Sequence, residues 1–172
     1  MGKSDQSRAV RVGVVMGSDS DLPVMRKCAE RLEAFGIACE MRIISAHRTP
    51  EAAHEYAATA AERGLKVLIA AAGMSAALGG VLAARTTLPV IGVPMAAGPL
   101  AGVDAALSTM QMPPGVPVAC MAIGEAGAVN AAILAAQVLA LSDPALAEGL
   151  AQFKADMARK VAEKDRMLNE KR

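Results

Sequence analysis

The chain has 172 residues, of which 53% are hydrophobic, 2% aromatic and 20% charged, with a formal net charge of +1. A chain of this length is most simply one domain, residues 1–172, whose core must consist of Ala, Val, Leu, Ile and Met because aromatic residues are so few. The small net charge argues against a nucleic-acid partner or an anionic membrane surface, and the lack of Trp removes a platform for stacking single-stranded bases.

Short apolar runs that end at Gly or polar residues predict strands, and apolar residues at helical spacing predict helices. A polar N-terminal tail, residues 1–10, precedes them and lacks the apolar segment of a signal peptide, so a cytoplasmic protein is expected. Thr49 and Pro50 predict a helix start, as cap and first residue. In chain order the elements are a strand at 11–16, a helix at 22–36, a strand at 38–44, a helix at 50–63, a strand at 66–72, a helix at 75–85, a strand at 89–94, a short helix near 104–111, a strand at 117–123, a helix at 126–141 and a C-terminal helix within 143–172.

The alternation of about five strands with helices predicts an α/β fold, a doubly wound parallel sheet with helices on both faces. Asp143 and Pro144 open the C-terminal helix, whose first half is amphipathic and whose end is charged. This helix is too long to lie entirely on a domain of this size. Its end is therefore expected to be exposed or to reach a neighbouring subunit.

The uncharged stretch 67–84 is long enough to cross a membrane. Its hydrophobicity comes mainly from Ala, and Gly73 and the pair Gly79-Gly80 interrupt it. A buried strand that turns into a buried helix is the favoured interpretation.

The three cysteines, Cys28, Cys39 and Cys120, are widely spaced and form no C-x-x-C pair. An odd number without such a pair argues against a disulfide framework and against a zinc site. Three buried free thiols in a reducing compartment are expected.

Ligands of an open parallel sheet bind outside the carboxyl ends of its strands. The predicted strands end in loops rich in Gly, Ser and Ala, in which backbone N–H groups and hydroxyls suit an oxygen-rich ligand. The loop "GSDSD", with Gly17, Ser18 and Asp21, suits ribose hydroxyls better than a polyphosphate, although a plain helix cap would also explain its Ser and Asp. Gly73 and Ser75 of the third loop are expected to add substrate contacts.

The stretch "SAHR" follows the second strand and carries His47, one of only two histidines. Imidazole titrates near neutral pH, so His47 is the candidate for proton transfer. Arg48 offers a planar fork of donors to a phosphate or carboxylate, although a surface ion pair with a helix glutamate would also explain it. His54 falls inside a predicted helix and is expected to be a surface residue.

Other chemistries find no support in the sequence. It has no cluster of His, Cys, Asp and Glu with metal-ligand spacing and no G-x-S-x-G elbow of a hydrolase. It also has no G-x-G-x-x-G fingerprint and no Walker loop, which argues against dinucleotides and nucleoside triphosphates.

Four stretches, "VVMGSDSD", "SAHRTPE", "PVIGVP" and "MQMPPGVPVACMAIGEAGAVNAAILAAQ", occur in order along the chain. Together they resemble the N5-carboxyaminoimidazole ribonucleotide mutases of bacterial purine biosynthesis, the class I-like PurE family, from about Arg11 to Leu141. The resemblance implies a three-layer flavodoxin-like fold, a homo-octamer and a reaction without metal or organic cofactor. The implied substrate is a ribonucleotide whose carboxylate moves from N5 to ring carbon C4 through trapped CO₂.

The resemblance also implies roles for individual residues. His47 matches the family's proton-transferring histidine, and Ser45 matches the serine beside it. Arg48 matches the arginine that contacts the substrate phosphate, while Ser18 and Asp21 match substrate-binding positions.

The third loop departs from the family pattern. It often reads like "GGAAHLPG" in the family, whereas this chain has "GMSAALGG", with Ala77 and Gly79 in place of histidine and proline. Members of a related group that carboxylate aminoimidazole ribonucleotide directly with CO₂ also lack this histidine. This departure favours the direct carboxylase as an alternative to the mutase. A more distant alternative is a non-catalytic sugar-phosphate or nucleotide-binding module.

Overall fold

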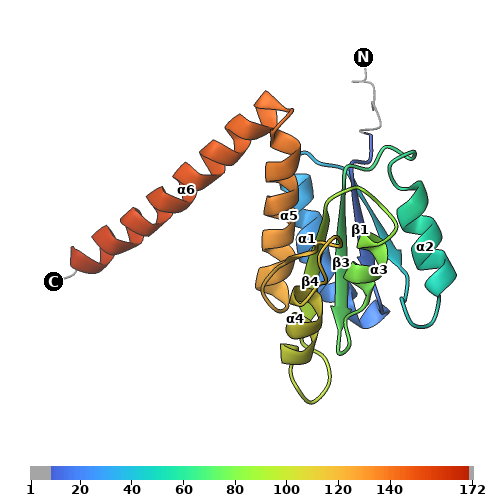
Figure 1. The fold of residues 1–172 in the computed structure, drawn as a ribbon. Helices are drawn as coiled ribbons and strands as arrows, with labels where there is room; N and C mark the ends of the chain where they lie inside the picture. Colours follow the sequence, from blue (N-terminus) through green and yellow to red (C-terminus); the bar gives the residue numbers. More distant parts are fainter. Residues whose placement is uncertain (1–8, 171–172) are drawn as a thin grey trace.

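The computed structural model describes residues 9–170, which form a five-stranded sheet between two layers of helices (Figure 1). All neighbouring strands are parallel, in the order β2-β1-β3-β4-β5. The strands are β1 Val12–Met16, β2 Cys39–Ile43, β3 Val67–Gly73, β4 Val90–Met95 and β5 Ala119–Cys120. The helices are a 3₁₀ turn at Asp19–Asp21, α1 Leu22–Ala34, α2 Pro50–Thr59, α3 Leu78–Ala83, α4 Val103–Met110, α5 Glu125–Ala140 and α6 Pro144–Asn169. This strand order is flavodoxin-like, so the predicted fold class is confirmed.

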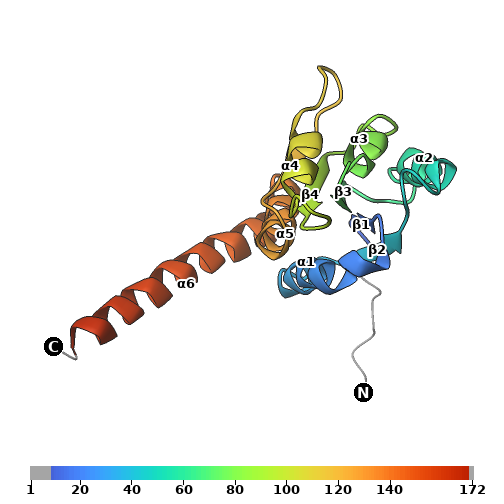
Figure 2. The same cartoon turned by 90° about the horizontal axis from the view of Figure 1, so that it is seen from below.

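The two faces of the sheet have separate cores, as Figure 2 shows from below. On one face α1 and α5 cover alternate residues of β1 such as Val12 and Val14, with a row of alanines from α5. On the other face α2 and α3 cover Val15 and Leu68. Because alanine is small, α5 packs close to the sheet, and aliphatic side chains fill the core without Trp, as the composition predicts.

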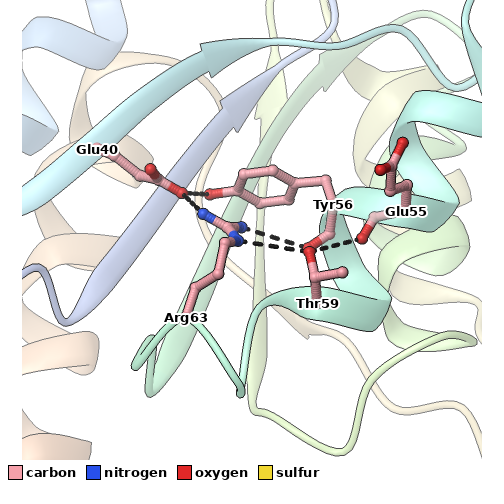
Figure 3. A network of polar contacts seen from close by, with 5 residues as sticks. All are labelled: Glu40, Glu55, Tyr56, Thr59 and Arg63. Carbon is pink, nitrogen blue, oxygen red and sulfur yellow. Dashed lines mark hydrogen bonds and ion pairs between the residues drawn. The ribbon is translucent and has the colours of Figure 1, made fainter.

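Helix α2 is tied to the sheet by a polar network that we call the Tyr56 cluster, formed by Glu40, Tyr56 and Arg63 (Figure 3). The Tyr56 hydroxyl donates to Glu40 Oε1 (2.8 Å), and Arg63 forms an ion pair with the same carboxylate. Gly13 of β1 makes room for this tyrosine, because a Cβ atom there would lie 2.3 Å from the hydroxyl oxygen. The cluster holds the C-terminal half of α2 against β1 and β2.

Several predicted boundaries are wrong. The strand predicted at 117–123 is reduced to β5, because Pro117 has no N–H to donate and β5 is the last strand of the sheet. The helix predicted at 75–85 is only α3, in a segment weakened by Gly79 and Gly80. Helix α2 ends at Thr59 rather than near Arg63, and turns lead from there to Gly64.

The cysteines are unpaired, as predicted, but only Cys28 is fully buried, whereas Cys39 and Cys120 are half-buried. Burial raises the pKa of the Cys28 thiol to about 12 and also raises those of the other two. Stretch 67–84 divides into β3 and α3, as expected. No helix among residues 9–170 has the length and apolar character needed to span a membrane.

The C-terminal helix begins as predicted, with Asp143 accepting a hydrogen bond from Leu146 N (3.2 Å) and pairing with Arg11 Nη1 (2.9 Å). Leu146 and Leu150 are buried, and the Phe153 ring meets Phe35 edge-on at 5.4 Å between centroids. Beyond these turns α6 extends away from the sheet (Figure 1). Residues 1–8 of the predicted N-terminal tail and the last two residues of the predicted C-terminal helix lie outside the described residues.

Candidate active site

A cavity of about 470 Å³ lies at the carboxyl ends of the strands. It is next to β1 and β3. The strand order changes direction between these two strands, because β2 lies on one side of β1 and β3 to β5 lie on the other. Ligands of doubly wound folds usually bind at such a point. All the residues predicted to form the site line it, namely Gly17, Ser18, Asp21, Ser45, His47, Arg48, Gly73 and Ser75. Loops far apart in the sequence thus meet in one cavity.

The β1–α1 loop forms one wall of the cavity. Gly17 N donates to Ala71 O of β3 (3.0 Å), which fixes where the loop leaves the sheet. Ser18 caps the 3₁₀ turn by accepting a hydrogen bond from Ser20 N (3.3 Å), so the simple helix-cap interpretation accounts for part of its role. Its hydroxyl also donates to Asp19 Oδ1 (3.1 Å), and Ser18 lines the cavity.

Asp21 is the one buried carboxyl side chain among residues 9–170, at 7% exposure. It occupies the cap position of α1 but makes no side-chain capping bond. Burial raises the pKa of this carboxyl, an effect that hydrogen bonds from Ser18 and Ser20 partly oppose. A desolvated carboxyl at a cavity wall is a strong acceptor for a ligand hydroxyl.

The turn between β2 and α2 carries His47 and Arg48, and its hydrogen bonds differ from the prediction. Thr49 stands at the cap position of α2, but its hydroxyl makes no capping bond. Instead Thr49 Oγ1 accepts from Ser45 N and donates to Ser45 O, both at 3.0 Å. The threonine hydroxyl therefore stabilises the turn between residues 45 and 49 and does not cap the helix.

Arg48 connects this turn to the β1–α1 loop. Its Nη2 donates to Gly17 O (3.0 Å), and its Nε donates to Ser45 Oγ (3.3 Å). No carboxylate in the described part of the chain pairs with it, so the alternative of a surface ion pair is wrong. The guanidinium is thus held at the cavity wall and keeps its positive charge uncompensated.

His47 lines the cavity and is exposed. Its imidazole makes no hydrogen bond within residues 9–170, so both ring nitrogens are open to a ligand. His54 is exposed on α2 and lies outside this cavity, as predicted.

The third and fourth loops form the apolar side of the cavity. Gly73 lies against Ala97, since a Cβ atom on Gly73 would come within 2.7 Å of the Ala97 Cβ. Ala77 lines the cavity, so His47 is the sole imidazole on its wall. Met74 also lines it, with a left-handed backbone (φ 56°) and 57% exposure.

Sequence reasoning missed Met74, Ser20 and Ala97. A left-handed backbone is typical of Gly or Asn, so a methionine gives no sequence signal for it. The loop 124–127, at the end of the fifth predicted strand, does not line the cavity. No cluster of metal-binding side chains is present among residues 9–170.

Fold and cavity together define a doubly wound α/β protein with a candidate ligand site at its switch point. The family model described as AIR carboxylase matches residues 11–160. The chain therefore belongs to the AIR carboxylase family.

Individual relatives agree with this assignment. A protein of Pyrococcus abyssi named N5-carboxyaminoimidazole ribonucleotide mutase is 55% identical over 149 residues, covering 87% of this chain and 84% of the relative. One of the same name from Pyrococcus horikoshii is 52% identical, covering 97% and 93%. The crystal structure of Treponema denticola PurE is similar with a TM-score of 0.79 at 34% identity, covering 91% of this chain and 97% of that chain.

Proposed function

We propose that this chain is an N5-carboxyaminoimidazole ribonucleotide mutase of purine biosynthesis. It moves the carboxylate from N5 to C4 of the imidazole ring to give 4-carboxy-5-aminoimidazole ribonucleotide. The relatives' names support this reaction, and the observation that carries the proposal is that one cavity contains His47, Arg48 and Asp21 together.

Arg48 binds the substrate phosphate, because its uncompensated guanidinium offers donors at the cavity wall. Asp21 accepts hydrogen bonds from the ribose hydroxyls, and Ser18, Ser45 and Ser75 add hydroxyl contacts. The backbone at Gly17 and Gly73 lets the ligand approach closely, since neither residue has a side chain.

His47 moves the proton that the reaction requires. When the carbamate N5–C bond breaks, N5 gains a proton and CO₂ is released. C4 then attacks CO₂, and the proton on C4 must leave to restore the aromatic ring. A single imidazole can give the first proton and take the second, so the reaction is balanced without any cofactor.

The small apolar residues on the far wall suit a trapped CO₂. Ala76, Ala77 and Ala97 offer no hydrogen bonds from their side chains, and Gly73 lets Ala97 pack closely. Such a wall excludes water and delays the escape of CO₂ before C4 attacks it.

Direct carboxylation of aminoimidazole ribonucleotide by CO₂ is a second candidate, favoured by Ala77 in place of a second imidazole. The two reactions are separated by assaying one preparation with N5-carboxyaminoimidazole ribonucleotide and with aminoimidazole ribonucleotide plus bicarbonate. The mutase predicts rapid conversion of the first substrate only, and equal rates on both would overturn the choice. A non-catalytic binding module predicts turnover of neither.

We also infer a homo-octamer in the cytoplasm. Apolar side chains are exposed along α4, at Val103, Leu107 and Met110, and on the projecting half of α6, at Met157 and Val161. Burial of these surfaces between copies would remove them from water. Light scattering should give eight times the monomer mass of 17.6 kDa, and a monomeric mass would contradict this inference.

A further inference from the structure

The hydroxyl of Thr49 is committed to a single neighbour, Ser45. It accepts a hydrogen bond from Ser45 N and donates one to Ser45 O, each at 3.0 Å, and Thr49 N also donates to Ser45 O (2.8 Å). Both backbone groups of Ser45 are therefore held by Thr49. A valine would have nearly the same shape but could make neither of the hydroxyl bonds.

Ser45 in turn holds Arg48. Ser45 Oγ accepts from Arg48 N (3.2 Å) and from Arg48 Nε (3.3 Å), while Arg48 Nη2 reaches Gly17 O (3.0 Å). A guanidinium has five N–H donors, so those contacts orient Arg48 and still leave donors for a ligand. The orientation of Arg48 thus depends on where the Ser45 hydroxyl is held.

Thr49 itself does not line the main cavity. It lines a neighbouring hollow, whose wall shares Gly17, Ser18, Ser45 and Arg48 with the main cavity. Any influence of its hydroxyl on a ligand must therefore pass through Ser45 and Arg48.

We propose that Thr49 is a positioning residue, which fixes the guanidinium of Arg48 for the substrate phosphate through Ser45. This inference rests on the proposed function for the identity of the substrate. The conformation of the turn is set before the ligand arrives, so binding does not have to order it.

The test compares Thr49→Val with Thr49→Ser in the full chain. The Kd of aminoimidazole ribonucleotide, measured by calorimetry, and the KM of the mutase substrate should both rise about tenfold in Thr49→Val, with a smaller change in kcat. Thr49→Ser, which keeps the hydroxyl, should remain within about twofold of the unchanged protein. Equal Kd and KM values for Thr49→Val and the unchanged protein would overturn the inference.

Thr59→Val is the matched control, because Thr59 is the last residue of α2, the helix that Thr49 precedes, and its hydroxyl donates to Glu55 O, away from the cavity. It should leave the Kd and KM unchanged. A rise equal to that of Thr49→Val would mean that any disturbance of α2 is sufficient, and it would also overturn the inference.

A double-mutant comparison separates positioning from a general loss of the turn. In an Arg48→Ala background, Thr49→Val should weaken aminoimidazole ribonucleotide no further, because the group it positions is already gone. An unchanged tenfold effect there would contradict the proposal. If the unchanged protein binds this ribonucleotide but converts neither substrate, the proposed function fails, while the Kd values still test Thr49.

Discussion

The two ends of helix α2 each use an arginine, but in opposite ways. Arg63 lies just beyond the C-terminal end and forms an ion pair with Glu40. Its guanidinium also donates to Tyr56 O and to Thr59 Oγ1 (both 3.4 Å), and its Cζ atom lies 4.5 Å from the centroid of the Tyr56 ring (Figure 3). Before the N-terminal end, the Arg48 guanidinium donates to a carbonyl and a hydroxyl, Gly17 O and Ser45 Oγ, and to no other group in the described part of the chain. Arg63 is compensated within the fold, whereas Arg48 pairs with no carboxylate among residues 9–170.

The ionisable groups around the two ends differ in the same way. Partial burial acts to raise the pKa of Glu40, but hydrogen bonds from Arg63 and Tyr56 outweigh it and the pKa lies below its usual value. Burial raises the pKa of Asp21, near the other end, and no cation within residues 9–170 pairs with it. The Tyr56 cluster stabilises its charges by pairing them, whereas the charged groups on the cavity wall are not paired with each other.

The largest effect should come from His47→Asn at the cavity end. Asparagine keeps a polar side chain but cannot transfer the proton, so turnover should fall by roughly 10²- to 10⁴-fold while the Kd of aminoimidazole ribonucleotide changes only a few-fold. Single-turnover kinetics and calorimetry measure the two quantities. Unaltered turnover would remove His47 from the mechanism.

Replacement of each arginine by lysine tests directly whether the two ends of α2 differ in role. Arg48→Lys should raise the KM about 10- to 100-fold with little change in melting temperature, because lysine cannot form the fork that contacts Gly17, Ser45 and a phosphate together. Arg63→Lys should lower the melting temperature and leave the KM unchanged. If the two variants shifted the same quantity, the two ends would not differ in role.

Tyr56→Phe should lower the free energy of unfolding by about 1 kcal/mol, because it removes the hydrogen bond to Glu40 and keeps the ring. Urea unfolding measures this change. The values of kcat and KM should not move, since the Tyr56 cluster does not line the cavity. A selective loss of kcat would show that the cluster also influences the site.

The smallest effect is the pH dependence of Glu40→Gln. A carboxyl whose pKa is lowered by folding adds stability above its unfolded value of 4.5, and this stability is lost as the pH falls through the folded pKa. The melting temperatures of Glu40→Gln and the unchanged protein should therefore differ at pH 7 and converge below about pH 4. A constant difference between pH 3 and pH 7 would contradict this assignment.

Local patterns predicted most of the elements and failed where glycine, proline or the sheet edge weakened a segment. The strands β1, β3 and β4 were predictable because buried parallel strands are continuous apolar runs. The length of β5 was not predictable from its apolar residues, since it depends on its single neighbour β4 and on Pro117. Thr49 illustrates the same limit, because a helix-start pattern cannot show that its hydroxyl turns back to Ser45.

The site could be predicted as a set of loops, since each follows the carboxyl end of a strand and parallel strands present those ends at one edge. The residue types of His47, Arg48 and Asp21 gave their chemistry directly. Met74 and Ala97 could not be identified, because the approach of the third and fourth loops arises only once β3 and β4 pair.

Residue types and their spacing along the chain are enough to predict the α/β class, the aliphatic core and the chemical groups at the strand ends. They do not show which of two arginines is paired within the fold. Arg48 and Arg63 flank the same helix and have the same chemistry. Glu40 and Tyr56 pack around Arg63, whereas Arg48 lies beside the neutral groups of Gly17 and Ser45, so of the two only Arg63 is paired with a carboxylate among residues 9–170. That distinction depends on strands β1 and β2 lying side by side, which no local pattern contains.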